Sequence, residues 1–473
     1  MCRKQYLIIL VVLAASAMIC SPAFASPFDV YAPPGRSASM SGAQTANAEG
    51  ATAVYDNPAA LAGVDPGVSA GTFATAGHAP ILLKDRPDGY DVPDLGSRSP
   101  ALPSDQTRNQ RRDTDTPEPL YGFTGGVITD FGGTDTRGAV LVMVPTNGLL
   151  VQQTYFADER ERYFSNQLHH EVIGSRLHRP VIEMGVARQL TERISAGIGG
   201  TYLPGTAVST EGYVADPSDQ SDVDLNTQVN TVNQWGLLAG LAAELPGDFS
   251  AGVAFRQGVA FEMEGTNEVQ VRGMPDESTQ QLNWVPVSTP SSLRAGVAWN
   301  PGDIEWAADA RYTFWSNYVD SHGEDAGFHN TIQGRLGAEW TYSEETRLRA
   351  GVGFVPTPVP EQTGRTNYVD NSRAMASIGG GHQFTFAERA LEASWHLQFH
   401  HLILRDTDKE PRNSYPDCAP GETALCDEVP DDLEDPETGQ PYDEAQGLQT
   451  GNPGFPGFVS GGWLASVGLE LRY

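Results

Sequence analysis

The spacing of the connections between alternating segments limits the possible folds of this chain more than any other feature. From about residue 119 onward, apolar residues alternate with polar or small ones, which is the two-residue period of a β-strand. Within 303–316, for example, Trp306 and Tyr312 share one face, and Glu305 and Arg311 share the other. A soluble β-sandwich would show the same alternation, so the pattern predicts strands without choosing between a sandwich and a barrel.

Short and long connections follow one another in strict alternation. The short ones cover 131–136, 191–192, 245–248, 300–303 and 342–346. The long polar ones cover 78–118, 157–177, 205–229, 263–289, 317–327, 357–370 and 405–457. A transmembrane β-barrel has short turns at its periplasmic end and long loops at its extracellular end. A sandwich has no reason to place its long loops on every second connection, so the sequence predicts an outer-membrane barrel.

The segments between these connections number about fourteen, an even number, as expected for a barrel with both chain ends in the periplasm. The expected strands are near 66–77, 119–131, 136–156, 178–190, 193–204, 230–245, 248–262, 290–300, 303–316, 328–342, 345–356, 371–386, 389–404 and 458–473. Backbone groups in lipid must all be paired, so the last strand must meet the first. Aromatic residues lie near expected strand ends, as in the girdles at the two membrane surfaces: Trp299, Trp306, Trp315, Trp340 and Tyr473. The predicted fold class is therefore all-β, a transmembrane antiparallel barrel.

The first 25 residues have the features of a secretory signal peptide. Two basic residues precede an apolar run over 7–19, and an Ala-Phe-Ala cleavage site ends at Ala25. The run is shorter than the ~20 residues that a membrane-spanning helix needs. A lipoprotein anchored at Cys20 is the alternative, but Ile19 before it is a poor match to the processing site. The mature chain is therefore expected to be exported.

The net charge limits the possible binding partners, and the cysteines predict a disulfide. The net charge is −30, which argues against nucleic-acid binding because the phosphates would be repelled. The mature part keeps only Cys418 and Cys426, within one exported, loop-like stretch, so a local disulfide is predicted. A zinc half-site is the alternative, but it lacks nearby histidine partners.

No segment predicts catalysis, a metal site or a cofactor. The sequence has no G-x-S-x-G, H-E-x-x-H, Walker A or dinucleotide-binding motif. Adjacent histidines on a strand point to opposite faces, so the pairs at 169–170 and 400–401 are poor metal clamps. The acidic loop 431–444 could hold Ca²⁺ through its carboxylates, but it lacks EF-hand spacing and fits a solvated loop better. We therefore expect a protein that is not an enzyme.

One piece of the chain differs from the strands. Residues 37–64 are rich in Ala, Gly, Ser and Thr, with almost no charge and few large apolar side chains. Such a segment cannot build a core of its own, but the lumen of a large barrel has room for it. Asn57 can cap a helix that begins at Pro58 and ends at Gly63, although an isolated surface cap would look the same. The predicted organisation is a signal peptide over 1–25, a hatch over 26–65 and a barrel over 66–473, with notably long loops at 78–118 and 405–457.

These segments resemble a known family, the FadL-type outer-membrane transporters of long-chain fatty acids and aromatic hydrocarbons. The stretch GAQTANAEGATAVYDNPAAL is similar to their hatch, which has an Asn-Pro-Ala motif after a run of small residues. Residues 288–316 resemble the family's paired strands before a Tyr/Trp-Trp-Ser ending. Residues 348–384 resemble a strand, a Pro-x-Pro-x-Pro loop and an Asp-x-x-Arg sequence that enters the next strand. The resemblance implies a fourteen-stranded barrel plugged by a hatch.

The resemblance also implies a mechanism. In the family, a hydrophobic substrate is caught in an extracellular groove, passes to a deeper pocket, and leaves sideways into the membrane after the hatch shifts. Carried over to this chain, Asn57, Pro58 and Ala59 would form the gate. The lateral opening would lie at a kink in the third strand, where Pro145 cannot donate to the ladder and Gly148 follows. An ordinary strand end at Pro145 is the alternative.

The ligand class stays open in the sequence. The charged head of a fatty acid needs cationic partners, and those of the family cannot be aligned with single positions here. The candidates are three lumen-facing arginines and two in a loop, namely Arg311, Arg335 and Arg349 with Arg160 and Arg162. The alternative is that these arginines pair with acidic residues of the lumen, which would leave the choice between fatty acid and uncharged hydrocarbon undecided.

The leading functional hypothesis is passive uptake of hydrophobic molecules across a Gram-negative outer membrane. The protein would be a monomer in contact with lipid and lipopolysaccharide, without a cofactor. A general diffusion porin is one alternative and predicts an open lumen. The other is a surface enzyme or adhesin mounted on the barrel, which would depend on loop 405–457 rather than on the hatch.

Overall fold

The computed structural model describes residues 27–83, 119–131, 135–146, 180–205, 207–215, 222–271, 278–319, 325–362, 368–408 and 457–473. Several sequence predictions lie outside these residues: the signal peptide, Gly148, Arg160, Arg162, the Cys418–Cys426 disulfide and the acidic loop 431–444.

Fourteen antiparallel strands close into a barrel, which confirms the predicted fold class and strand number. They are β1 (Gly67–His78), β3 (Tyr121–Asp130), β4 (Thr136–Pro145), β5 (Val181–Thr191), β6 (Ile194–Leu203), β9 (Gln234–Leu245), β10 (Phe249–Arg256), β13 (Ser292–Trp299), β14 (Ile304–Thr313), β15 (Thr331–Thr341), β16 (Thr346–Val355), β17 (Arg373–Phe386), β18 (Arg389–Asp408) and β19 (Gly457–Arg472). The first strand pairs with the last from Ser69↔Arg472 to His78↔Trp463, so the sheet has no open edge along this length. A short strand, β2 (Ile81–Leu83), pairs with the far end of β19.

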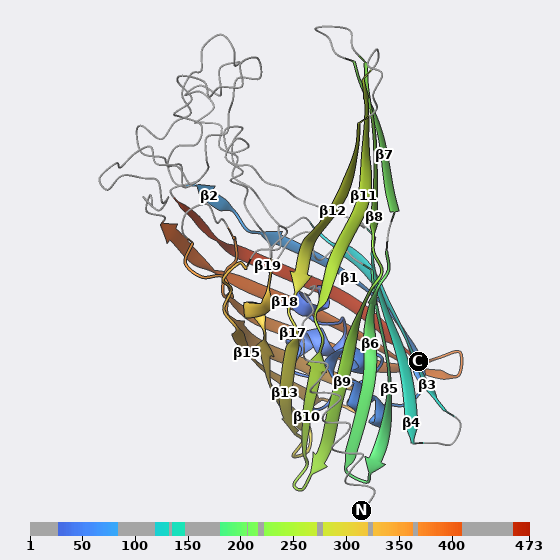
Figure 1. Cartoon of the computed structure of the whole chain (residues 1–473). Coiled ribbons are helices and arrows are strands. Elements are labelled where there is room, and N and C mark those ends of the chain that lie inside the picture. The colour runs from blue at the N-terminus through green and yellow to red at the C-terminus, as the bar shows by residue number, and fades with distance from the viewer. Residues whose placement is uncertain are drawn as a thin grey trace, which may run out of the picture.

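Four strands rise beyond the barrel as a separate sheet, which is visible as the tall extension in Figure 1. They are β7 (Ala207–Ala215), β8 (Asp222–Thr231), β11 (Val259–Val271) and β12 (Ser278–Thr289). The polar composition of 205–229 and 263–289 predicts loops without strands, and this prediction is wrong. The difference has a local cause, since turn-forming residues such as those at 216–221 interrupt the segment and its strands are rich in Asn, Gln, Ser and Thr.

The N-terminal segment lies inside the barrel, as the sequence predicted, and we call residues 27–64 the hatch (Figure 1). Its elements are short: α2 (Pro27–Tyr31), α3 (Arg36–Ser39), α4 (Ala53–Asp56) and the 3-10 helix η1 (Pro58–Gly63). Almost every residue from 30 to 59 is buried, although few are large and apolar. This burial is supplied by the barrel wall, because helices of four to six residues cannot form a core by themselves.

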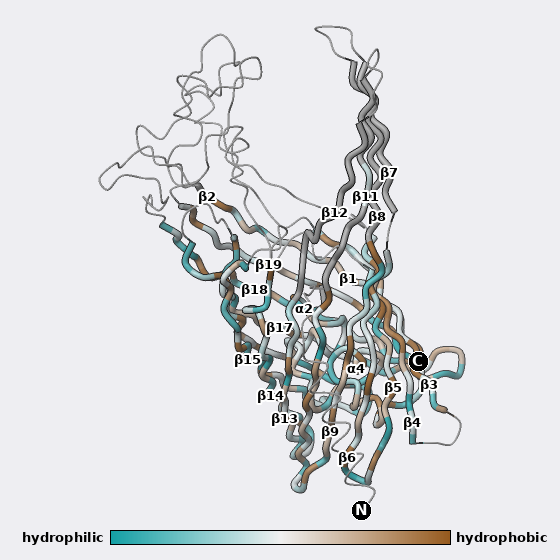
Figure 2. The backbone as a smooth tube through the Cα atoms, in the orientation of Figure 1, coloured by the Kyte–Doolittle hydropathy of each residue, from teal (hydrophilic) through white to brown (hydrophobic). Residues whose placement is uncertain are grey.

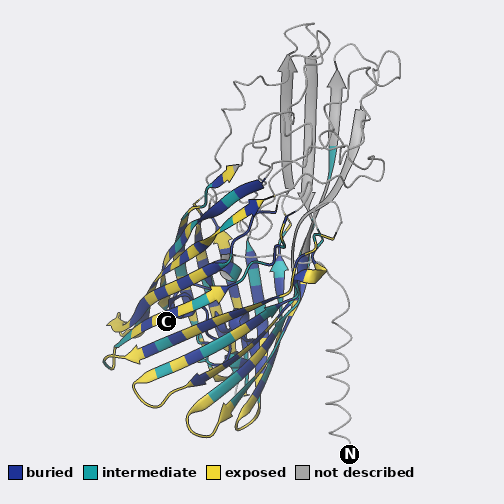
Figure 3. Cartoon of the chain, turned by 90° about the vertical axis from the view of Figure 1, so that its left-hand side faces the viewer, coloured by how far each residue is buried: buried dark blue, intermediate teal, exposed yellow. Residues whose placement is uncertain are grey.

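Burial along the strands is reversed relative to a water-soluble protein. Large apolar side chains point outward, where Ile332 is 66% exposed and Leu336 is 58% exposed. Polar and charged residues on the opposite face are buried. Along the coloured strands, Figure 2 shows the alternation in hydropathy and Figure 3 the alternation in burial. An outward apolar surface on a closed sheet fits a hydrocarbon surrounding rather than water. Among the described residues, no helix has the length and apolar character needed to cross a membrane.

Candidate functional site

Asn57 stands at the centre of the hatch and ties three parts of the molecule together. Its extended backbone places the side-chain oxygen where it accepts the Ala59 backbone N–H at 3.0 Å, just after Pro58 begins η1. The side-chain nitrogen donates to the backbone oxygens of Thr45 at 2.8 Å and of Leu241 in β9 at 3.1 Å. All three interactions are buried or nearly so, so Asn57 joins the two halves of the hatch to the barrel wall.

The wall around η1 is made of small residues, and we call Gly185, Gly197, Gly240 and Gly252 of β5, β6, β9 and β10 the glycine wall. A Cβ atom at Gly197 would collide with the Pro58 backbone, and one at Gly240 would collide with the Asn57 side chain. Only glycine allows the hatch backbone to approach this closely. Beside this wall, Asp56 of the hatch pairs with Arg294 of β13 at 3.4 Å, and the Ser195 hydroxyl of β6 donates to the Ala59 carbonyl at 3.0 Å. The close fit is therefore supplemented by an ion pair and by hydrogen bonds.

The opposite wall holds the hatch through charge. Arg36 in α3 is only 6% exposed, and its guanidinium donates to Glu339 of β15 at 3.0 Å and to Glu305 of β14. The same group lies 3.7 Å from Glu49 of the hatch. Arg349 of β16 also bonds Glu339, and it reaches Glu392 of β18 at 3.2 Å. We call this network, with Arg347 and Arg472 at its periphery, the ionic wall.

Further hydrogen bonds extend the same anchoring. Thr45 donates to Asp309 of β14 through its backbone N–H at 2.9 Å and through its hydroxyl. The Ser377 hydroxyl of β17 donates to the Ser39 carbonyl at 2.7 Å. The hatch residues between 36 and 45 are therefore fixed to the wall formed by β14–β19.

Three inward-facing arginines and one histidine lie on β14, β15, β17 and β18, and we call Arg311, Arg335, Arg373 and His400 the cationic group. All four are buried, with exposures from 8% for Arg311 to 0% for His400. Arg311 pairs with Asp29 of the hatch at 2.9 Å. Among the described residues, no carboxylate lies within 4 Å of Arg335 or Arg373. In the β17–β18 ladder Arg373 pairs with Leu402, two residues from His400, and in the β14–β15 ladder Arg311 pairs with Gln333, two residues from Arg335.

Several polar atoms of this group have no hydrogen-bond partner among the described residues. They are Nε of Arg311, Nε of Arg335, Nε and Nη1 of Arg373, and both ring nitrogens of His400. The Tyr31 hydroxyl of the hatch also has none, and its ring meets the His400 ring edge to face with centroids 5.5 Å apart. Burial raises the pKa of Tyr31 to about 12, so its phenol is a neutral donor. Buried polar atoms are normally paired, and such a concentration of exceptions suggests a place for an acceptor.

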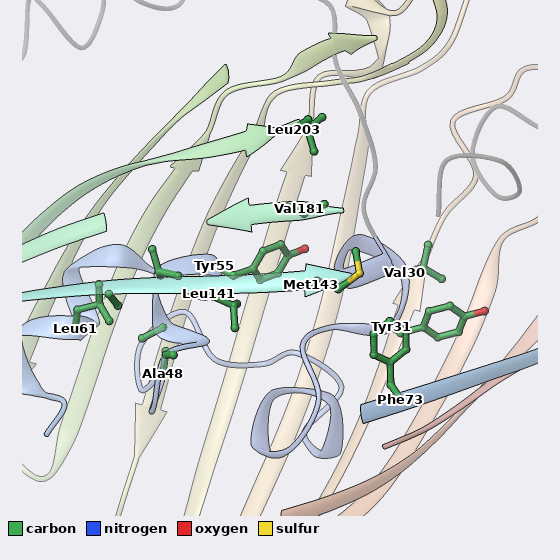
Figure 4. Packing of buried hydrophobic residues seen from close by; sticks show 14 of the residues in the cluster. Val30, Tyr31, Ala48, Tyr55, Leu61, Phe73, Leu141, Met143, Val181 and Leu203 are labelled. Carbon is green, nitrogen blue, oxygen red and sulfur yellow. The ribbon is translucent and has the colours of Figure 1, made fainter. Parts of the chain in front are cut away.

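Apolar side chains adjoin these polar ones. Tyr31 and Val30 of the hatch belong to one cluster with Phe73 of β1 and Met143 of β4. Figure 4 shows Tyr31 beside Phe73, while Tyr55 and Leu61 lie nearer to Leu141 on the other side of the cluster. The lumen therefore combines a cationic patch with apolar surface, which suits a molecule with one anionic end and a hydrophobic body.

The structure separates the sequence-predicted residues into groups. Arg311 and Arg335 belong to the cationic group, whereas Arg349 is occupied by two glutamates of the ionic wall. Pro145 is the last residue of β4, and its strand pairs with β3 in unbroken register up to Gly122↔Pro145. Asn57 bonds to β9, which is three strands away from β4 in the barrel order, so the two predicted features contact different parts of the wall.

Sequence reasoning missed Arg36, Arg373 and His400. Arg373 was present in the Asp-x-x-Arg sequence, and its inward face follows from the strand alternation. His400 was considered only as one of an adjacent pair, although that reasoning places one member of the pair in the lumen. Arg36 precedes the small-residue stretch, and nothing local shows that its partners lie some 303 positions further along the chain.

A closed barrel with a lipid-facing exterior and a lumen filled by its own N-terminal segment defines a plugged outer-membrane transport protein. Comparisons with known proteins agree. Residues 176–410 match the model of the family described as outer membrane protein transport protein (OMPP1/FadL/TodX). The chain belongs to this FadL/TodX family, whose members are outer-membrane channels for hydrophobic compounds rather than enzymes.

Solved structures support the fold over almost the whole length. A Pseudomonas aeruginosa FadL homologue has a TM-score of 0.59 and 13% sequence identity, covering 96% of this chain and 99% of its own. The Pseudomonas putida toluene transporter TodX has a TM-score of 0.51 and 13% identity, with the same two coverages. At these identities the likeness concerns the fold alone. A search of curated proteins finds no match to the sequence.

Proposed function

We propose that this outer-membrane channel takes up amphiphiles with a carboxylate head, such as long-chain fatty acids, and releases them sideways after the hatch shifts. The observation that carries this proposal is the cationic group, whose unpaired nitrogens face the lumen beside an apolar cluster. A carboxylate accepts several hydrogen bonds at once and would satisfy these donors. Arg335 and Arg373 would hold the head, and Tyr31 would donate its hydroxyl proton to the same oxygen atoms.

The two walls suggest how the hatch would move. Residues 36–45 are fixed by buried ion pairs and hydrogen bonds, whereas η1 rests on glycines. Residues 53–63, with Asn57, Pro58 and Ala59, are therefore the part proposed to move, and Asn57 would be the hydrogen-bonded catch. The kink candidate at Pro145 remains the lateral opening implied by the family resemblance.

An uncharged hydrocarbon is the second candidate ligand. It is favoured by the apolar cluster around Phe73 and Met143, and one structure with a similar fold is a toluene transporter. A hydrocarbon would leave the donors of the cationic group unpaired, which is why the carboxylate ligand is preferred. A general diffusion porin fits less well, because the hatch occupies the lumen.

Uptake assays can separate these proposals. Labelled oleate and labelled toluene would be supplied to cells that carry the wild-type protein, no protein, or the double variant Arg335→Gln/Arg373→Gln. Each lost charged hydrogen bond is worth about 1.5–3 kcal/mol, so the variant should bind oleate at least about tenfold more weakly. Toluene uptake should not change.

The control is Arg188→Gln, which removes an exposed arginine of β5. Oleate uptake that is equal in the double variant and the wild type would contradict the carboxylate site. Uptake of both compounds that does not depend on the protein at all would contradict transport of these ligands.

A further inference from the structure

The outer face of the barrel has a step at its periplasmic end, where the β17–β18 hairpin extends beyond the neighbouring strand. The β17–β18 ladder continues to Phe386↔Arg389, whereas β19 follows β18 only as far as Arg472, opposite Glu392. The turn at residues 387–388 is one of the short connections that mark the periplasmic end of a barrel. Figure 1 shows this hairpin projecting beside the C-terminal end of the chain. The hairpin and the ends of β19 and β1 therefore form a corner.

A hollow of about 490 Å³ lies in this corner, and we call it the rim hollow. The strand alternation places the side chains of several lining residues on the outer face of the barrel. They include Ala70 of β1, Leu471 and Tyr473 at the end of β19, and Phe386, Arg389 and Leu391 of the hairpin. Phe386 is 67% exposed and Leu471 is 52% exposed. Apolar side chains that face outward here contact lipid, so the rim hollow opens toward the membrane and not toward the lumen.

Arg389 is the charged residue on the outer face of the rim hollow. Its guanidinium carbon lies 4.8 Å from the centre of the Tyr473 ring, at a cation–π distance. Among the described residues, no carboxylate lies within 4 Å of this guanidinium. Contact with the ring covers one face of the group and leaves the N–H donors along its edge available. A guanidinium edge at the level of the lipid headgroups matches a phosphate, which accepts two parallel N–H bonds.

A channel of small residues leads from the rim hollow along the outer face of β1. Its outward side chains are those of Ala70, Thr72, Ala74 and Ala76. The outward side chains of the two neighbouring strands are larger and rise on both sides, namely Val467, Leu469 and Leu471 of β19 with Tyr121, Phe123 and Val127 of β3. From Ala70 to Ala76 the channel is about 20 Å long. It would hold an extended acyl chain that points from the periplasmic rim toward the centre of the membrane.

We propose that the rim hollow and the channel bind one phospholipid of the periplasmic leaflet, with its phosphate at Arg389 and one acyl chain along β1. The cation, the apolar hollow and the channel lie in the order in which a phospholipid presents its headgroup and its chains. A second copy of this chain is a poorer occupant, because it would bury Arg389 without a counter-charge. The site also spans the junction of β1 and β19, so the lipid would contact both of the strands that close the barrel.

Native mass spectrometry of the detergent-purified protein tests the headgroup contact. Dioleoyl phosphatidylglycerol is titrated into the wild type, Arg389→Gln and Arg188→Gln. Arg188 is the matched control, because it is an exposed, outward-facing arginine near the periplasmic end of β5 and does not line the rim hollow. We expect one lipid to bind the wild type and Arg188→Gln alike, and to bind Arg389→Gln at least about tenfold more weakly. Dioleoylglycerol, which lacks the phosphate, should also bind the wild type at least about tenfold more weakly.

A second variant tests the channel separately. Ala70→Leu would fill the end of the channel that adjoins the rim hollow and should weaken binding of phosphatidylglycerol with Arg389 in place. Val186→Leu, an outward change on β5, is its control. The shift in gel mobility on heating shows that each variant has formed the barrel.

Equal lipid binding by Arg389→Gln and Arg188→Gln would overturn the site and leave only the general lipid coat of the barrel. Equal binding of phosphatidylglycerol and dioleoylglycerol would overturn recognition of the phosphate. A dimer of the lipid-free protein that is lost in Ala70→Leu would assign the channel to a second copy of the chain instead.

Discussion

The two walls that surround the hatch hold it by different interactions, namely buried ion pairs on one side and close packing against glycines on the other. The ionic wall grips residues near Arg36 with charges that are buried and mutually paired, and removing one partner leaves an uncompensated buried charge. The glycine wall touches η1 through backbone and small side chains, and beside it the hatch is held by the Asp56–Arg294 ion pair rather than by a network of several charges. The part of the hatch near η1 can therefore move while the part near Arg36 stays bound to the barrel.

Breaking the ionic wall should have the largest effect. Arg36→Ala would leave Glu305 and Glu339 near each other without their shared hatch partner, at a cost of about 3–5 kcal/mol. The whole hatch should loosen, so liposomes carrying the variant should become permeable to small hydrophilic solutes. Arg347→Ala is the control, since Arg347 lies 3.9 Å from its glutamates and its side chain is 32% exposed. An impermeable Arg36→Ala barrel would argue against charge as the anchor.

Crowding the glycine wall should have the next largest effect. Gly197→Val places a branched side chain against Pro58, and overpacking of this kind destabilises by about 1–3 kcal/mol. The end of the hatch near η1 should be displaced while Arg36 stays bound, so protease should cleave near residue 60 and spare the segment near residue 40. At Gly125 a Cβ atom would meet open space, so Gly125→Ala should leave cleavage unchanged. Equal cleavage at both hatch sites would show that the walls do not act separately.

Removing the Asn57 side chain should have a smaller effect. Asn57→Ala loses a helix cap worth about 1 kcal/mol and leaves the Thr45 and Leu241 carbonyls without this donor. Oleate uptake should change severalfold with the barrel intact, as judged by its resistance to unfolding in detergent. Asn57→Asp keeps the capping oxygen but turns a carboxylate oxygen toward the Thr45 and Leu241 carbonyls, so it should disturb uptake at least as much as Asn57→Ala. Uptake at the wild-type rate in Asn57→Ala would remove Asn57 from the proposed gate.

The smallest expected effect is a pH dependence of hatch docking. Burial raises the pKa of Asp56 to about 6, against the opposing charge of Arg294. Since this pKa is above the unfolded value, the stabilisation is complete below that value and is lost as the pH rises through about 6. Docking should weaken by about 1 kcal/mol between pH 5 and pH 7. Hydrogen exchange of α4 measures this change, and Asp56→Asn should abolish it.

The barrel could be predicted from the sequence because lipid on one side and a polar lumen on the other impose alternation on every strand. In β14, for example, the alternation alone predicts that Trp306 faces outward and that Arg311 faces the lumen. The cationic group could not be predicted in the same way, since Arg373 and His400 come close to Arg311 only when separate strands curve around one lumen. The small residues and Asn57-Pro58 predicted the hatch, but they did not predict its anchor. Glu305 and Glu339, the partners of Arg36, lie in distant strands, and nothing in the sequence around them indicates this contact.

The separation between Arg36 and Glu339 has a consequence for biogenesis. Arg36 precedes every strand of the barrel in the sequence, while its partner Glu339 follows 303 positions later. Glu392, which completes the network through Arg349, comes later still. The plug therefore cannot lock until the C-terminal strands have been added, and a barrel stalled midway would hold an unfastened hatch. Fastening of the hatch thus requires the wall that contains Glu339 and Glu392 to be in place.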